Sequence, residues 1–123
     1  MSQTFQEGSV WRVSFVKVAP GQGERYLGDV GPKRKQVLDQ AISDGLIVSY
    51  KTLNGLAFGK DDWDFMFMVE YKNWAAIDGL REKLDRLNEQ YVGDEAVIEE
   101  TLSYRSPIRE LMGEKFMQEI HFQ

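Results

Sequence analysis

The alternation of apolar and polar residues along this chain predicts four strands, and the stretches between them repeat apolar residues every three to four positions, as helices do. The predicted strands cover residues 10–18, 47–53, 63–71 and 115–122. Pro20 and Gly21 form a turn after the first strand, and Gly113 marks a turn before the last one. The pattern therefore indicates a chain that mixes strands and helices.

The helical region between the first two strands contains a proline. Apolar residues at helical spacing continue from about residue 23 to residue 44, and Gly31-Pro32 interrupts them. Proline removes a helix hydrogen bond and clashes with the preceding turn. The sequence therefore predicts two helical pieces, residues 23–30 and 32–44, with a break or strong bend at Pro32.

Two further helices are predicted in the second half of the chain. Asn73 can cap the first of them. Its apolar face is formed by Ile77, Leu80, Leu84 and Leu87. Asp94 can cap a shorter helix, which ends before Pro107.

The resulting order β-α-β-β-α-(α)-β consists of two β-α-β units joined by a hairpin, which is the ferredoxin-like arrangement. We expect an α+β fold with a four-stranded antiparallel sheet and the main helices on one of its faces. At 123 residues the chain fits a single domain, residues 1–123. Within it, residues 1–9 are expected to form a flexible N-terminus and residues 94–113 an extra helical segment.

The third predicted strand is apolar on both of its faces. Its two alternating sets are Trp63, Phe65, Phe67, Val69 and Tyr71, and Asp64, Met66, Met68 and Glu70. The more aromatic set is expected to face the helices, which leaves Met66 and Met68 on the uncovered side. A large exposed apolar face usually marks an interface, so we expect a second copy of the chain to cover it in a homodimer.

Three stretches carry a resemblance to a known family: VWRVSFVKVAPG at residues 10–21, GLIVSYKTL at 45–53 and DWDFMFMVEYKNWAA at 62–76. In the order of the elements and in their hydrophobic pattern, these stretches resemble members of the dimeric α/β-barrel superfamily. Within that superfamily they resemble most the antibiotic-biosynthesis monooxygenase-like and NIPSNAP-like proteins. The resemblance implies that two ferredoxin-like sheets form a barrel. The superfamily includes cofactor-free oxygenases, haem-dependent enzymes, isomerases and many proteins without an assigned activity, so it implies a fold and no single reaction.

Composition excludes several partners. The net charge of −5 and the pI of about 4.9 oppose binding to nucleic acid, which requires clustered Lys and Arg. The absence of cysteine excludes disulfides, thiolate catalysis and cysteine-ligated metals. The sequence has neither a signal-peptide pattern nor the ~20 apolar residues of a membrane helix. We therefore expect a soluble, cytoplasmic protein without a membrane partner, unless an export signal has been removed.

The sequence predicts no metal site and no cofactor. His121 is the only histidine, so it can act as at most one general base or one axial ligand, and a half-exposed position on the terminal strand is the favoured interpretation. Asp61, Asp62 and Asp64 form a carboxylate cluster, but they lack the glycine and the distal glutamate of a calcium loop. We interpret the cluster as a solvated hairpin tip. The sequence also lacks nucleotide-binding, zinc-protease and serine-hydrolase motifs.

Polar residues within the otherwise apolar strands are the candidates for a ligand site. They are Arg12, Ser14, Ser49, Lys51, Glu119 and His121. If Arg12, Ser14 and Ser49 point to the same side as Met66 and Met68, these five residues form an apolar pocket with a few convergent polar groups.

The alternative arrangement places the same polar residues at a rim or in solvent. Arg12 and Lys51 would then pair with Asp64 or Glu70 across neighbouring strands. A change of one residue in register reverses the two faces of a strand, so the sequence leaves both arrangements open.

Two functions from different classes follow, and the sequence assigns neither. In the first, the protein binds a small apolar or aromatic molecule beside the sheet, and as an enzyme it would be a cofactor-free oxygenase or isomerase. Arg12 or Lys51 would stabilise an enolate-like anion, and His121 or a carboxylate would move the proton. In the second, it is a non-catalytic binding or assembly protein whose sheet face serves only homodimerisation. A cavity above roughly 300 Å³ lined by Arg12, Ser14 and Ser49 would favour the first function.

Overall fold

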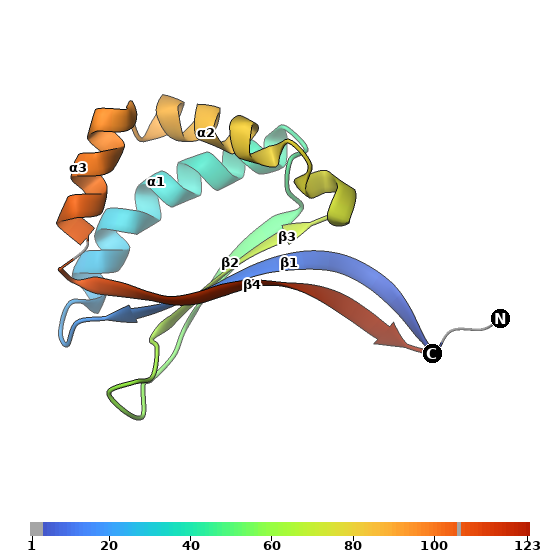
Figure 1. Ribbon diagram of the computed structural model, residues 1–123, viewed down its shortest axis with the longest axis horizontal. Helices are drawn as coiled ribbons and strands as arrows, with labels where there is room; N and C mark the ends of the chain where they lie inside the picture. The colour runs from blue at the N-terminus through green and yellow to red at the C-terminus, as the bar shows by residue number, and fades with distance from the viewer. Residues whose placement is uncertain (1–3, 106) are drawn as a thin grey trace.

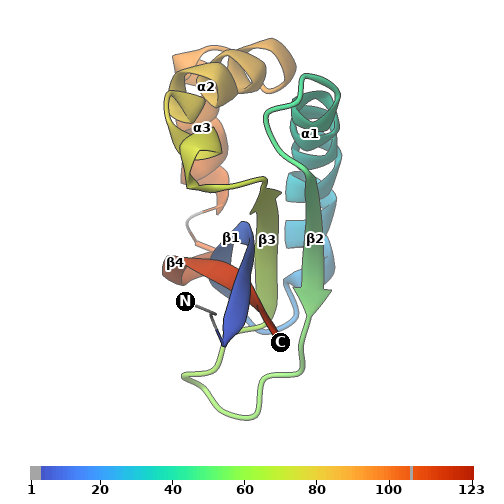
Figure 2. The ribbon, with the colours of Figure 1, turned by 90° about the vertical axis from the view of Figure 1, so that its right-hand side faces the viewer.

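A computed structural model of the chain describes residues 4–105 and 107–123, apart from the side chains of Glu95 and Tyr104. The strands form one sheet, and the helices lie together on one side of it (Figure 1, Figure 2). In chain order the elements are β1 Phe5–Val18, α1 Gly23–Ser43, β2 Ser49–Asn54, β3 Phe65–Tyr71, the short 3₁₀ helix η1 Trp74–Ile77, α2 Leu80–Tyr91, α3 Glu95–Arg105 and β4 Arg109–Phe122.

The sheet has the strand order β2-β3-β1-β4, and each neighbouring pair is antiparallel. β1 and β3 are therefore the central strands, while β2 and β4 form the edges. This order is that of the ferredoxin-like fold. The predicted α+β fold, with helices on one face of a four-stranded antiparallel sheet, is confirmed.

The alternation along β3 separates the two faces of the sheet. Phe65, Phe67, Val69 and Tyr71 are buried beneath the helices, and we call this side the covered face. The other side, the open face, carries Trp11, Val13, Phe15, Ser49, Lys51, Leu53, Met66, Met68, Glu70 and Met117. The prediction that the more aromatic set of β3 faces the helices is confirmed.

Two clusters of buried apolar residues join the helices to the covered face. One lies around Tyr71 and includes Leu38 and Ala41 of α1 and Leu87 of α2. The other lies around Phe65 and Phe67. In the second cluster, the ring centre of Tyr26 is 6.1 Å from that of Phe65 and 6.4 Å from that of Phe67. Burial of these large side chains supplies the main stabilisation of the layer between α1 and the sheet.

Helix α1 continues without interruption across Pro32, so the prediction of two helical pieces is wrong. Proline cannot donate a hydrogen bond to the carbonyl of Gly28, but Gly28 and Pro32 both lie on the exposed side of the helix. Water can therefore satisfy that carbonyl. On the buried side, Val30 and Val37 lie on either side of the proline and are both covered. Their packing outweighs the local preference of Pro32.

We expect Pro32→Ala to raise the free energy of unfolding by about 1 to 3 kcal/mol, because alanine restores the missing hydrogen bond and removes the ring clash. Urea denaturation at a fixed protein concentration measures the change. Gln36→Ala, at an exposed position one turn later, is the control and should change stability by only a few tenths of a kcal/mol. Equal stability of the two variants would contradict this account of α1.

The long strands β1 and β4 differ most from their predicted boundaries. Residues 5–7 pair with residues 120–122, so this part of the predicted flexible N-terminus belongs to β1, while residues 1–3 lie outside the described residues. Gly113 lies within β4, opposite Phe15 and beside a shift in register, so it marks a bulge where a turn was predicted. The predicted extra helical segment is helical only in α3. The boundaries of β1 and β4 depend on how the two strands pair with each other. The local pattern of apolar and polar residues does not show which strand pairs with which.

The helix predicted from Asn73 is divided into two. The Asn73 carboxamide oxygen accepts the backbone N–H of Ala76 at 3.0 Å, but the element that it caps is η1. Gly79 then takes a φ of 69°, and α2 begins at Leu80. A left-handed residue cannot continue a helix, so Gly79 interrupts a stripe of apolar residues that is otherwise helical in spacing.

Candidate functional site

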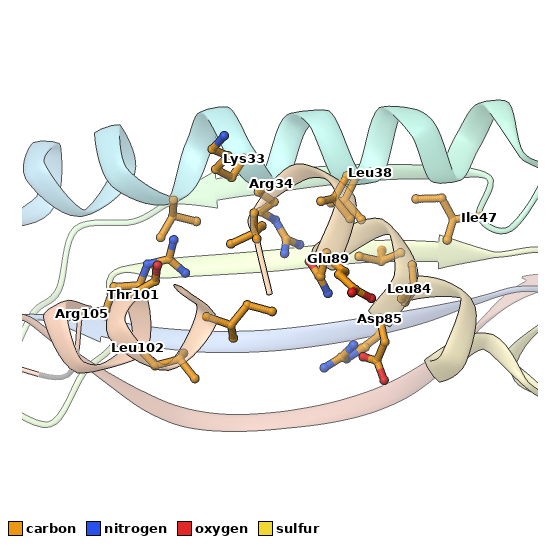
Figure 3. A pocket seen from close by; sticks show the side chains of 18 of the residues that line it. Lys33, Arg34, Leu38, Ile47, Leu84, Asp85, Glu89, Thr101, Leu102 and Arg105 are labelled. Carbon is orange, nitrogen blue, oxygen red and sulfur yellow. The ribbon is translucent and has the colours of Figure 1, made fainter. Parts of the chain in front are cut away.

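A cavity of about 790 Å³ lies between the covered face and the helices, and we call it the pocket (Figure 3). Residues of β1 and β3 line it from the sheet, and residues of α1, α2 and α3 line it from the helical layer. Apolar side chains from each of these helices and from β3 contribute, among them Val30, Val37, Leu38, Val69, Leu84 and Ile98. A concave cavity with apolar walls and a few polar groups is typical of a small-ligand site.

Arg34 of α1 extends into the pocket, whereas the neighbouring Lys33 side chain points away from the sheet (Figure 3). The guanidinium carbon of Arg34 lies 4.7 Å from the centre of the Phe67 ring. Its Nε is buried without a hydrogen-bond partner, and no carboxylate among the described side chains forms an ion pair with it. Burying an unpaired charge costs on the order of several kcal/mol, and a cation–π contact offsets about 2 kcal/mol of that.

Arg12 of β1 brings a second guanidinium to the pocket. Its Nη2 donates to Glu114 Oε2 at 2.8 Å, and Ser14 Oγ donates to the same oxygen at 3.3 Å. The hydrogen bond to Glu114 raises the pKa of Arg12, and the same bond lowers the pKa of Glu114. Burial lowers the pKa of Arg34, and the positive charge of Arg12 lowers it further. Arg12 is thus neutralised by β4, while the charge of Arg34 is not balanced by any described side chain.

Tyr71 lies on the covered face at the side of Arg12 and also lines the pocket. Burial raises the pKa of its phenol, although the nearby charge of Arg12 acts in the opposite direction. The phenol therefore stays protonated at neutral pH, where it is available as a hydrogen-bond donor.

Helix α3 borders the pocket on the side away from α1. The carboxylate of Asp94 accepts the backbone N–H of Val97 at 3.1 Å, which confirms the predicted cap. At the other end of the helix, Arg105 Nε donates to Asp29 Oδ2 at 2.7 Å and ties α3 to α1. Gly93 has a φ of 137°, and a Cβ there would lie 2.8 Å from the Val97 side chain, so the turn between α2 and α3 requires glycine.

The five residues predicted to bind a ligand lie on different faces of the sheet. Arg12 and Ser14 belong to the covered face, while Ser49, Met66 and Met68 belong to the open face. Only Arg12 lines the pocket. The structure therefore does not bring the five together, because the register of β1 against β3 places Arg12 and Ser14 opposite the buried residues of β3.

The other two catalytic candidates also lie away from the pocket. Lys51 Nζ is 5.0 Å from the centre of the Trp11 ring on the open face. His121 lies near the end of β4, where its Nε2 is 3.1 Å from Glu119 Oε2. A Cβ at Gly8 would lie only 2.9 Å from the same Nε2, so glycine leaves room for the imidazole. His121 is an exposed residue of the terminal strand, the interpretation that the sequence favoured.

The carboxylates considered as cross-strand partners of Arg12 and Lys51 have other partners in the structure. Glu70 Oε1 accepts a hydrogen bond from Ser49 Oγ at 2.6 Å. Asp64 Oδ2 accepts a backbone N–H of β1 at 2.7 Å. Arg12 forms an ion pair with Glu114 of β4, and Lys51 lies over the Trp11 ring. The predicted pairing of Arg12 and Lys51 with Asp64 or Glu70 is therefore wrong.

The open face is apolar and partly covered by its own side chains. Val13 is only 3 % exposed although no helix covers it. The Phe15 ring packs against Trp63 with a centroid distance of 4.8 Å. Leu53 and Met117 are each 48 % exposed. One copy of the chain therefore leaves an apolar surface in solvent at the edges of this face.

Acidic residues and the histidine do not gather in a group of three or more that could hold a metal ion, as far as the described residues extend. In the predicted carboxylate cluster, Asp62 organises the connection between β2 and β3: its carboxylate accepts the N–H groups of Phe58 and Trp63, both at 3.0 Å. Within the described part of the chain, the helices are too short or too polar to cross a membrane.

Arg34 is a pocket residue that was not among the candidates predicted from the sequence. Arg34 lies in the run Lys33-Arg34-Lys35, which is typical of a solvated helix surface. The signal that could have identified it is its spacing: position 34 follows Val30 by four residues and precedes Val37 by three, so it lies on the apolar stripe of α1.

Comparison with known proteins identifies the fold. No family model matches the chain, and no curated protein matches it at a significant level. A NIPSNAP family protein with unknown function from Agrobacterium tumefaciens has 13 % identity and a TM-score of 0.60, over 94 % of this chain and 92 % of that one. A dimeric ferredoxin-like protein from an uncultured marine organism has 12 % identity and a TM-score of 0.51, over 96 % of both chains.

HapK from Hahella chejuensis is also similar, with 12 % identity and a TM-score of 0.50, over 89 % of this chain and 91 % of that one. Identities this low establish a shared fold, and function does not follow from fold. The chain thus has the fold of NIPSNAP family and dimeric ferredoxin-like proteins, which confirms at the level of fold the resemblance carried by its strands.

Proposed function

We propose that the pocket binds a small apolar or aromatic molecule. The observation that supports this most strongly is the pocket itself, a cavity of about 790 Å³ lined by apolar residues of three helices and of β3 and by seven charged residues. Small-ligand pockets have volumes of roughly 300–1,000 Å³. The ligand lies on the covered face, so it contacts Arg12 and Arg34 and does not contact Met66 or Met68.

Two copies of the chain associate through their open faces into an α/β barrel. The apolar composition of the open face supports this association, because burial of such a surface is favourable. The description of the similar marine protein as dimeric also supports it. In this arrangement each protomer keeps its own pocket on the helical side, so binding and assembly use opposite faces of the sheet.

The catalytic form of this proposal is cofactor-free oxygenation or isomerisation of the bound molecule. That chemistry requires one group that stabilises an enolate-like anion and another that moves a proton. Arg12 is the predicted candidate that lines the pocket, and Asp85 and Glu89 of α2 are lining carboxylates that could carry a proton. The second candidate function is that of an assembly protein without a ligand, which the apolar open face also supports.

Filling the pocket tests the proposal. Ile98→Trp is expected to weaken binding of 2-naphthylmethanol, a neutral aromatic probe, by at least about tenfold, because the indole occupies part of the cavity. Isothermal titration calorimetry measures the affinity. Ile42→Trp places the same side chain on α1 outside the pocket and should bind like the wild type. An Ile98→Trp variant that binds the probe as well as the wild type does would leave only the assembly function.

A further inference from the structure

The charges of the pocket indicate the class of small molecule that it takes, and this inference rests on the proposed small-molecule binding. Four cationic residues line the pocket, in a chain whose net charge is −5. They are Arg12, Lys33, Arg34 and Arg105. Three acidic residues, Asp85, Glu89 and Glu99, line the same cavity, so the ligand class depends on which of the cations lacks an anionic partner.

Two of the arginines are neutralised within the chain. Arg12 forms an ion pair with Glu114 at 2.8 Å, and Arg105 forms one with Asp29 at 2.7 Å. Lys33 is exposed and points to solvent (Figure 3). These three charges are accounted for without a ligand.

Arg34 differs from the other three. Its contact is with the face of the Phe67 ring, 4.7 Å from the guanidinium carbon. Its Nε is buried without a hydrogen-bond partner among the described residues, as is that of Arg12, but Arg34 has no ion pair with a described carboxylate. Asp85, Glu89 and Glu99 line the same pocket, but all three are exposed, and none of them forms an ion pair with Arg34. The positive charge of Arg34 at the cavity therefore has no anionic partner among the described side chains.

We infer that the pocket takes a small acid, a molecule with an apolar or aromatic body and a carboxylate or similar planar anion, and that Arg34 binds the anionic group. A guanidinium is planar and donates two parallel N–H groups, which match the two oxygens of a carboxylate. Phe67 holds one face of the guanidinium and Nε is enclosed by the protein, so the Nη1 and Nη2 groups are the donors that remain for the ligand. Val37, Leu38 and Val69 line the same cavity and contact the apolar body of the acid.

Three probes that share a naphthalene ring test this inference: 2-naphthoate is an anion at neutral pH, 2-naphthylmethanol is neutral and 2-naphthylmethylamine is a cation. Titration calorimetry on the wild type should give a Kd for the acid at least about tenfold below that of the alcohol, with the amine binding most weakly. This comparison requires no variant. In Arg34→Met, which keeps a long side chain and removes the charge, the Kd of the acid should rise to that of the alcohol.

Arg86→Met, at an exposed position of α2 outside the pocket, is the matched control and should retain the preference for the acid. Circular dichroism establishes that each variant is folded. Equal affinities of the wild type for acid and alcohol would overturn the inference and leave the pocket proposal standing. A preference for the acid that persists in folded Arg34→Met would overturn the assignment to Arg34. If none of the three probes binds, the proposed function falls, and the inference falls with it.

Discussion

Met66→Asp is expected to convert the proposed dimer into monomers. Met66 lies on the open face with Phe15 and Leu53 opposite it on the neighbouring strands, so no cation lies directly opposite the new carboxylate. In a two-fold dimer the substitution occurs twice at one interface. Desolvating an unpaired carboxylate costs on the order of several kcal/mol, which is comparable to the whole stability of a small domain. Light scattering coupled to gel filtration should give half of the wild-type mass.

The control for this experiment is Asp78→Ala, at an exposed position between η1 and α2, which should leave the mass unchanged. Met68 is a less suitable site, because Lys51 lies opposite it and could pair with an aspartate. Unfolding of Met66→Asp would also agree with a buried open face. A wild-type protein that is monomeric at micromolar concentration, or a Met66→Asp variant that remains dimeric, would refute the barrel.

Phe67→Ala is expected to lower the free energy of unfolding by about 3 to 5 kcal/mol. Phe67 is 7 % exposed, and its ring centre lies 6.4 Å from those of Tyr26 and Phe65. Truncation leaves a cavity in this aromatic cluster, and it also removes the ring beneath the buried charge of Arg34. Leucine fills most of the space of the ring, so Phe67→Leu should lower the free energy of unfolding by less than Phe67→Ala does.

The matched control is Phe58→Ala, which removes the same side chain from a position that is 96 % exposed in the connection between β2 and β3. It should change the free energy of unfolding by less than about 0.5 kcal/mol. Urea denaturation must compare all variants at one protein concentration, because dimerisation makes stability depend on concentration. If Phe67→Ala lowers the free energy of unfolding by less than about 1 kcal/mol, Phe67 is not part of the stabilising core of the fold.

The strand order could be predicted from the order of the helices and strands along the chain, which is that of the ferredoxin-like fold. The covered side of β3 could also be predicted, because Phe65, Phe67, Val69 and Tyr71 form an unbroken apolar set. The faces of β1 could not. Arg12 and Ser14 alternate with apolar residues on either side, so their orientation depends on pairing with β3, which is more than fifty residues away in the chain. For that reason the sequence did not reveal that Arg12 and Ser14 lie on the face opposite to Met66 and Met68.

Pro32 shows the same limit in a helix. The residue has the local signature of a break, and the signature is overruled by packing of α1 against residues from distant strands. Arg34 is the converse case. It belongs to a short basic run that is locally ordinary, and its significance depends on Phe67 from β3 lying beneath it. Both features depend on contacts between elements, which periodicity alone does not contain.

The division of β3 into two alternating sets limits how this protein can change during evolution. Substitutions at Met66 or Met68 can alter the open face while Val69 and Tyr71 go on lining the pocket, so the two surfaces can diverge independently. An inserted or deleted residue within the strand has no such freedom, because it would exchange the two faces along the rest of the strand. Changes of length can accumulate instead in the exposed connection at residues 55–61, which makes that segment the place where lineages of this protein would first differ in size.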